Sequence, residues 1–121
     1  MPNKMKGFYD NIERSTLANL AYREVVYTDV NLQLVYMTLQ PLEEIGLEVH
    51  PTTTQFIRVE SGFGTALIAR QSYPLFPGAV VIVPPNTYHN IINTSTITLL
   101  QLYTIYSPPE HPPGTYEFNK V

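Results

Sequence analysis

Four side chains able to bind a metal ion occur in short segments that are otherwise largely apolar: Glu48, His50, Gln55 and His89. Alternate residues of an extended chain point to the same face, so Glu48 and His50 share one face of their segment. By the same rule Gln55 lies on a face with Ile57, a β-branched core former. The pattern predicts that all four polar groups point into one interior from three strands.

Buried polar groups cost free energy unless they are paired, and a buried carboxylate costs more than a neutral group. One bound cation would satisfy all four groups together, and imidazole and carboxylate are ligands that Mn, Fe, Co, Ni or Zn accept. The alternatives are a hydrogen-bonded turn histidine at His89, an exposed His50 and a solvated Glu48. Gln55 could bind the metal, hydrogen-bond to a ligand, or be an ordinary strand residue.

The composition limits the other chemistry. The 121 residues include no cysteine, which excludes disulfides and thiolate sites, and the net charge of −3 provides no basic surface for nucleic acid. No segment has the length of a membrane-spanning helix or a secretory signal, so we expect a cytoplasmic protein with no membrane partner. Because only 14% of residues are charged, we also expect a homodimer.

The elements that must position these residues are short strands. Residues 10–22 have weak helical periodicity, and eight apolar or β-branched segments follow between turn signals. They are Arg23–Thr28, Leu32–Leu39, Leu47–His50, Gln55–Glu60, Gly64–Ala69, Ala79–Val83, Tyr88–Asn93 and Thr98–Ser107. The pattern predicts an all-β protein, with an arm or short helix over 1–22, a barrel over 23–107 and a Pro-rich tail over 108–121. The prolines lack amide donors, so we expect the tail to end the barrel as a strap across one edge.

Two spaced motifs add to this pattern. The first is Glu48-x-His50-x4-Gln55-x6-Gly62, and the second is Gly78-x5-Pro84-x-Asn86-x2-His89-x3-Asn93. Together they resemble the two motifs of the cupin superfamily, in which the first reads His-x-His, Glu, Gly and the second Gly-x5-Pro-x-Gly-x2-His-x3-Asn. The region from 44 to 110 looks most similar to small single-domain cupins labelled as resembling mannose-6-phosphate isomerase. This resemblance implies a jelly-roll β-barrel with a metal near one mouth.

Three positions of the first motif depart from the family pattern. Glu48 replaces a histidine, Gln55 replaces the glutamate and Leu42 replaces the opening glycine of the first motif. Two histidines and one carboxylate then remain, which is the ligand type of non-haem Fe(II) oxygenases. Asn86 replaces a glycine, a mild change because Asn tolerates positive φ.

The expected function is that of a metal-binding protein that binds or acts on a small oxygen-rich ligand of the sugar or polyol type, for example as an isomerase-like enzyme. The alternatives are a non-catalytic ligand-binding module and an Fe(II)-dependent oxygenase, because a barrel of this kind does not define a reaction. Neutral ligands are expected over phosphorylated ones, since Arg58 and Arg70 do not point clearly into the barrel. We expect Asn93 to bond to nearby backbone, and His111 to be structural.

Overall fold

The computed structural model describes residues 6–121, so the first five residues of the expected N-terminal arm lie outside the described part. The chain forms one short helix and nine strands within that range: α1 (Ile12–Ala18), β1 (Arg23–Thr28), β2 (Gln33–Leu39), β3 (Thr54–Ser61), β4 (Gly64–Ile68), β5 (Gln71–Leu75), β6 (Val80–Val83), β7 (His89–Asn93), β8 (Leu100–Ser107) and β9 (Tyr116–Glu117). The predicted all-β jelly-roll barrel with a short N-terminal helix is confirmed. Within residues 6–121, no helix has the length and apolar character needed to span a membrane.

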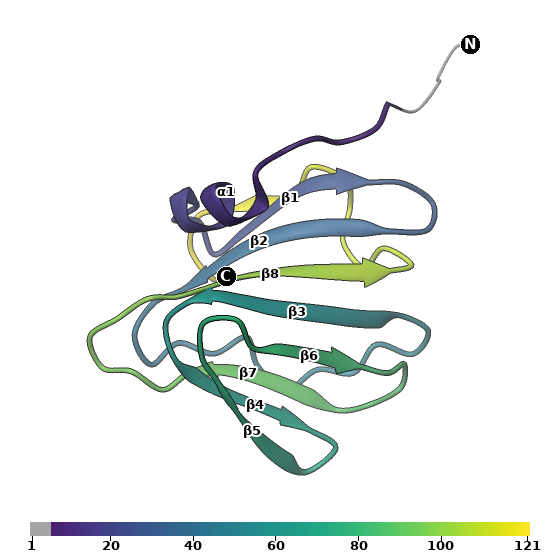
Figure 1. Cartoon of the computed structure of the whole chain (residues 1–121). Helices are drawn as coiled ribbons and strands as arrows, with labels where there is room; N and C mark the ends of the chain where they lie inside the picture. Colours follow the sequence, from purple (N-terminus) through teal and green to yellow (C-terminus); the bar gives the residue numbers. More distant parts are fainter. Residues whose placement is uncertain (1–5) are drawn as a thin grey trace.

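Two antiparallel sheets face each other across the core (Figure 1). The larger has the strand order β6-β3-β8-β2-β1-β9, and the smaller has the order β5-β4-β7. Alternation along β3 is regular: Gln55, Ile57 and Val59 are buried, and the residues between them are partly exposed. This confirms that Gln55 shares the inner face with core residues.

Helix α1 begins at an N-cap, because the Asn11 side chain accepts a hydrogen bond from the Arg14 amide. The helix lies near β8, β3 and β2, and the Gln101 side chain donates hydrogen bonds to the carbonyls of Leu17 and Asn19. It therefore covers part of the outer face of the large sheet and takes no part in the barrel interior.

Three segments differ from the sequence expectation. Leu47–His50 forms no strand; Glu48 makes an isolated antiparallel bridge with His89. Strand β5 was not predicted, because four of its five residues are exposed and it contains Pro74. The tail forms no strand through its prolines, but Tyr116 and Glu117 beyond them pair with β1.

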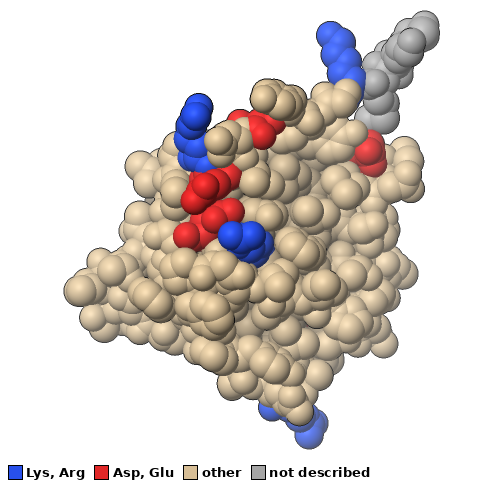
Figure 2. Space-filling model, viewed as in Figure 1, with Lys and Arg blue, Asp and Glu red and all other residues tan. Residues whose placement is uncertain are grey.

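The charged side chains are unevenly placed on the surface. On the face shown in Figure 2, most Lys, Arg, Asp and Glu residues gather in the upper part, around α1. Few lie over β4, β5 and β6, where Val80 and Ile82 are exposed. This leaves a largely uncharged outer surface at one side of the barrel.

Candidate metal centre

The backbone around the site is held by paired hydrogen bonds. The amide of Glu48 donates to the carbonyl of His89, and the amide of His89 donates back to Glu48, both at 2.9 Å. The Asn86 amide donates to the carbonyl of His50 at 2.7 Å, from a turn in which Asn86 has φ of 58°. Segments far apart in the sequence are thereby fixed side by side, so their side chains meet in defined positions.

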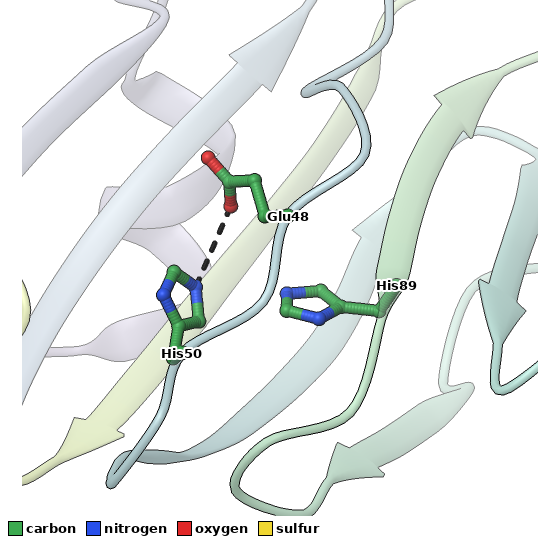
Figure 3. A group of neighbouring side chains, drawn as sticks. All are labelled: Glu48, His50 and His89. Atoms are coloured by element: carbon green, nitrogen blue, oxygen red, sulfur yellow. Dashed lines mark ion pairs between the residues drawn. The ribbon is translucent and has the colours of Figure 1, made fainter.

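The side chains of Glu48, His50 and His89 converge in the barrel (Figure 3). One potential ligand atom from each residue lies within 4.8 Å of the others. The two imidazole rings have centroids 5.1 Å apart, and Glu48 Oε1 lies 3.5 Å from His50 Nε2. Both histidines are buried, whereas Glu48 is partly exposed at the edge of the site. Three of the four residues singled out in the sequence thus come together.

The buried nitrogens of the two histidines lack partners. His89 Nδ1 lies 2.9 Å from the carbonyl oxygen of Thr87, which can only accept, so Nδ1 carries the hydrogen and Nε2 is left as an acceptor. Nε2 of His89 and Nε2 of His50 are both buried and have no hydrogen-bond partner among the described residues. Unpaired buried acceptors cost free energy. A cation between them would remove this cost, so these residues fit a divalent metal ion.

Gln55 contributes a further unpaired acceptor from β3. Its Nε2 donates to Thr104 Oγ1 at 3.1 Å and to Tyr106 Oη at 3.3 Å, which uses both amide hydrogens. Its Oε1 is buried without a partner. Tyr106 also packs edge-on against His50, with ring centroids 5.8 Å apart, and so connects Gln55 to the site. The amide orientation therefore leaves Oε1 unpaired, and an amide oxygen is an atom that a metal ion can bind.

Tyr106 is a buried neighbour of the site. Burial raises the pKa of its hydroxyl above the ordinary value, so this residue stays protonated at neutral pH. Because Tyr106 Oη accepts a hydrogen bond from Gln55, its own hydrogen remains available to another acceptor. The site thus combines acceptor atoms suited to a cation with a neutral hydroxyl donor.

Sequence reasoning missed Glu110, which lies beside the site, and Arg23, whose charge acts on the neighbouring Tyr106 and His111. Glu110, from the tail, has its Oε2 3.3 Å from His50 Nδ1. Arg23 on β1 is mostly buried and forms an ion pair with Glu117. Glu110 follows prolines and belongs to no strand, so no alternation signal could place it. Arg23 shares strand parity with the buried Val25, and that signal could have indicated an inward guanidinium.

The remaining predicted residues have structural contacts. Asn93 is buried, and its bonds to the Ser95 amide and the Thr98 carbonyl are the expected contacts with nearby backbone. Its Nδ2 also donates to the carbonyls of Leu39 and Gln40, which are distant in the sequence and were not expected. His111 packs edge-on against Tyr106, with ring centroids 5.2 Å apart. Burial, followed by the nearby positive charge of Arg23, lowers the pKa of His111 to about 4.

Comparison with known proteins places the chain among relatives of the same fold. Residues 35–106 match the sequence model of the cupin domain. The chain is 40% identical over 121 residues to the uncharacterized protein L612 of Acanthamoeba polyphaga mimivirus, covering 98% of this chain and 76% of that protein. It is 39% identical to the uncharacterized protein YrkC of Bacillus subtilis, covering 96% of this chain and 65% of that relative's length.

Solved structures agree with this assignment. BH2720 from Bacillus halodurans has a TM-score of 0.90 and 38% identity, over 93% of this chain and 89% of that chain. KdgF from Halomonas sp. has a TM-score of 0.67 over 73% of this chain and 78% of that chain. At 18% identity, KdgF supports the fold alone.

Proposed function

Because the chain belongs to the cupin superfamily, we propose that it binds one divalent transition metal ion through Glu48, His50 and His89, with Gln55 Oε1 as a further oxygen donor. The observation that carries this proposal is that His50 Nε2, His89 Nε2 and Gln55 Oε1 are buried without hydrogen-bond partners, and that both histidines lie beside Glu48. His111 Nε2 is also buried and unpartnered, but His111 is not part of that group. A cation would satisfy the acceptor atoms of His50, His89 and Gln55 and would neutralise the adjacent Glu48 carboxylate.

Metal analysis and thermal unfolding test this proposal. We expect Mn, Fe, Co, Ni or Zn to copurify or, when added to chelator-treated protein, to raise the melting temperature, because a ligand that binds only the folded state stabilises it. His89→Ala should weaken metal binding at least about 100-fold, since first-coordination ligands contribute more than the residues that orient them.

The chain offers a matched control for this experiment. It contains three histidines, and His111 lies outside the proposed ligand set. His111→Gln should therefore retain metal binding. An unchanged melting temperature with every metal, or equal metal loss in the His89 and His111 variants, would contradict the proposed ligand set.

We further propose that the ligand of this metal centre is a small, neutral, oxygen-rich molecule of the sugar or polyol type, and that the protein is isomerase-like. A bound metal would supply Lewis-acid polarisation of a ligand oxygen. The protein's own contribution is the buried hydroxyl of Tyr106, which can donate to a ligand oxygen. The Arg23 guanidinium is already paired with Glu117, so it provides little free positive charge for a phosphorylated ligand.

A panel of neutral and phosphorylated sugars and polyols, added to the metal-loaded protein, tests this ligand class. Neutral compounds should raise the melting temperature, and an isomerase-like activity should convert the bound compound to an isomer detectable by NMR. Binding without conversion would favour a ligand-binding module. A preference for phosphorylated compounds would overturn the proposed class.

An Fe(II)-dependent oxygenase is the second candidate. The observation that favours it is the Glu48, His50 and His89 set, because two histidines and one carboxylate leave coordination positions for substrate and dioxygen. Substrate-dependent oxygen consumption by the Fe(II) form, absent from the Zn(II) form, would support this activity over isomerisation.

We also propose that the protein forms a homodimer through the largely apolar surface around β6, where the one charged neighbour of Val80, Arg58, is paired with Glu60. Val80 and Ile82 are 50% and 57% exposed there, and Phe56 stacks on Tyr103 with ring centroids 6.3 Å apart. Light scattering should give twice the monomer mass for the wild type. Ile82→Glu should give a monomer, because it would bury an unpaired charge at the interface.

A further inference from the structure

The C-terminal tail places a carboxylate against the outer nitrogen of a proposed metal ligand. Glu110 Oε2 lies 3.3 Å from His50 Nδ1, on the opposite side of the imidazole ring from Nε2. His50 Nε2 is the buried, unpartnered nitrogen that faces Glu48. A carboxylate therefore lies near each ring nitrogen of His50: Glu110 at the outer Nδ1, and Glu48, itself a proposed metal ligand, at the inner Nε2.

The backbone around Glu110 is fixed by a buried side chain of the large sheet. Gln33, on β2, accepts hydrogen bonds through Oε1 from the amides of Glu110 and His111, at 3.2 and 3.0 Å. Its Nε2 donates to the carbonyl of His111 at 2.7 Å. Gln33 is fully buried, so it holds this part of the tail in one position. The carboxylate of Glu110 is thus presented from a rigid backbone.

The second proposed histidine ligand also has an oxygen atom beside its Nδ1, in this case a hydrogen-bonded backbone carbonyl. His89 Nδ1 is paired with the carbonyl oxygen of Thr87, which leaves Nε2 as the acceptor. An oxygen acceptor at Nδ1 fixes the tautomer and the ring orientation of a metal-binding histidine, and a carboxylate also makes the imidazole a better donor to the metal. Glu110 occupies the corresponding place at His50.

We propose that Glu110 is a positioning residue, which holds the hydrogen of His50 on Nδ1 and directs Nε2 toward the metal. This inference rests on the proposed metal centre. It also gives the Pro-rich tail a role in the site, because the tail brings to the barrel a group that no strand provides.

Imidazole NMR tests the proposal directly. The chain has three histidines, so the ring nitrogens of His50 can be assigned by comparison with variants at the other two. In metal-free wild-type protein at mildly alkaline pH, we expect the neutral His50 ring to carry its hydrogen on Nδ1. In Glu110→Ala, we expect a mixture of the two tautomers, whereas in Glu110→Gln the side-chain carbonyl should restore the Nδ1 form.

Zinc affinity provides the second measurement. By competition with a chelating dye, Glu110→Ala should bind Zn²⁺ about 10–100-fold more weakly than wild type, and Glu110→Gln should lose less. Glu13→Gln, which removes an exposed carboxylate from α1, is the control and should match wild type in both measurements.

The outcomes separate this proposal from the metal proposal. An unchanged His50 tautomer in Glu110→Ala would overturn the positioning role. A fall in zinc affinity would not rescue it if the melting temperature of the metal-free protein fell as well, because such a combined loss indicates only a structural role for Glu110. If wild-type protein bound no metal, the metal proposal would fail, and the tautomer would still show whether Glu110 orients His50.

Discussion

Gln55 differs from the other proposed ligands because a neutral amide can be buried without a counter-charge. Its nitrogen is satisfied by Thr104 and Tyr106, so the metal-free site leaves only its carbonyl oxygen unpaired. A carboxylate in the same place would be a stronger metal ligand, and its charge would be costly whenever the metal was absent. The amide therefore favours a stable metal-free protein over a tight metal site.

Gln55→Glu tests this trade-off. The metal-free variant should melt several degrees below wild type, because an uncompensated buried carboxylate costs at least about 1–3 kcal/mol. Its zinc affinity should rise about tenfold or more. Gln71→Glu, at an exposed position of β5, should change neither quantity. Equal zinc affinity in the Gln55 variant and wild type would place Gln55 beyond reach of the metal.

Asn93 carries a prediction about stability alone. Its Nδ2 donates to three carbonyls and its Oδ1 accepts from the Ser95 amide, all from a fully buried position. Asn93→Asp keeps the shape but turns a donor into a charged acceptor that faces those carbonyls. Urea unfolding should show a loss of at least about 2–3 kcal/mol, against almost none for Asn119→Asp at an exposed position.

Single residues were predictable from the sequence where strand alternation applies. The inward placement of Gln55 and the burial of His89 with Ile91 follow from parity on β3 and β7. Parity could not locate Glu110, because the residues before it include prolines and form no ladder. Its approach to His50 depends on Gln33, a contact 77 residues away in the chain.

At the scale of elements, the glycine turns determine how the strands connect. Gly62 follows β3 and Gly78 precedes β6, and both have positive φ, at 96° and 92°. Their surroundings differ, because a Cβ at Gly62 would collide with the carbonyl oxygen of Leu99, whereas a Cβ at Gly78 would meet nothing within 4 Å. A side chain at either position would therefore carry the strain of a left-handed backbone, but only a side chain at Gly62 would also clash with a neighbour.

Alanine at these two positions should therefore differ in effect. Gly78→Ala should lose about 1 kcal/mol of unfolding free energy from the left-handed conformation. Gly62→Ala should lose at least about 2 kcal/mol more, since the backbone of Leu99 must also move. Chemical denaturation of both variants measures the difference, and equal losses would show that the turn relaxes without cost.

Strand prediction succeeded where the apolar pattern was strong and failed where tertiary contacts decide the structure. Strand β5 has the composition of a loop, and it forms because β4 offers it a complete antiparallel partner. Leu47–His50 has the composition of a strand, yet only Glu48 pairs with β7. Propensity depends on such contexts, so neither result could be obtained from the local sequence.

At the scale of the whole molecule, the tail crosses from β8 past the barrel interior to the far edge of the large sheet. Gln33 binds it near Glu110, and Tyr116 and Glu117 pair with β1 at its end. His111 belongs to the first attachment, because Gln33 also bonds to its backbone, and its ring is packed against Tyr106. Closure of this side of the barrel therefore buries an imidazole that is neutral in the folded protein.

This burial predicts how stability depends on pH. The pKa of His111 is lowered to about 4 in the folded state from 6.5, so between these values the unfolded chain binds the proton and the folded chain does not. Its contribution to stability is therefore complete above pH 6.5 and falls as the pH decreases toward 4, by at most about 1.4 kcal/mol per pH unit. His111→Gln should flatten that part of the curve in chelator-treated protein, measured by urea unfolding across the range. Because His50 and His89 remain in both proteins, the difference between the two curves isolates His111, and parallel curves would show that the tail opens to solvent before the barrel unfolds.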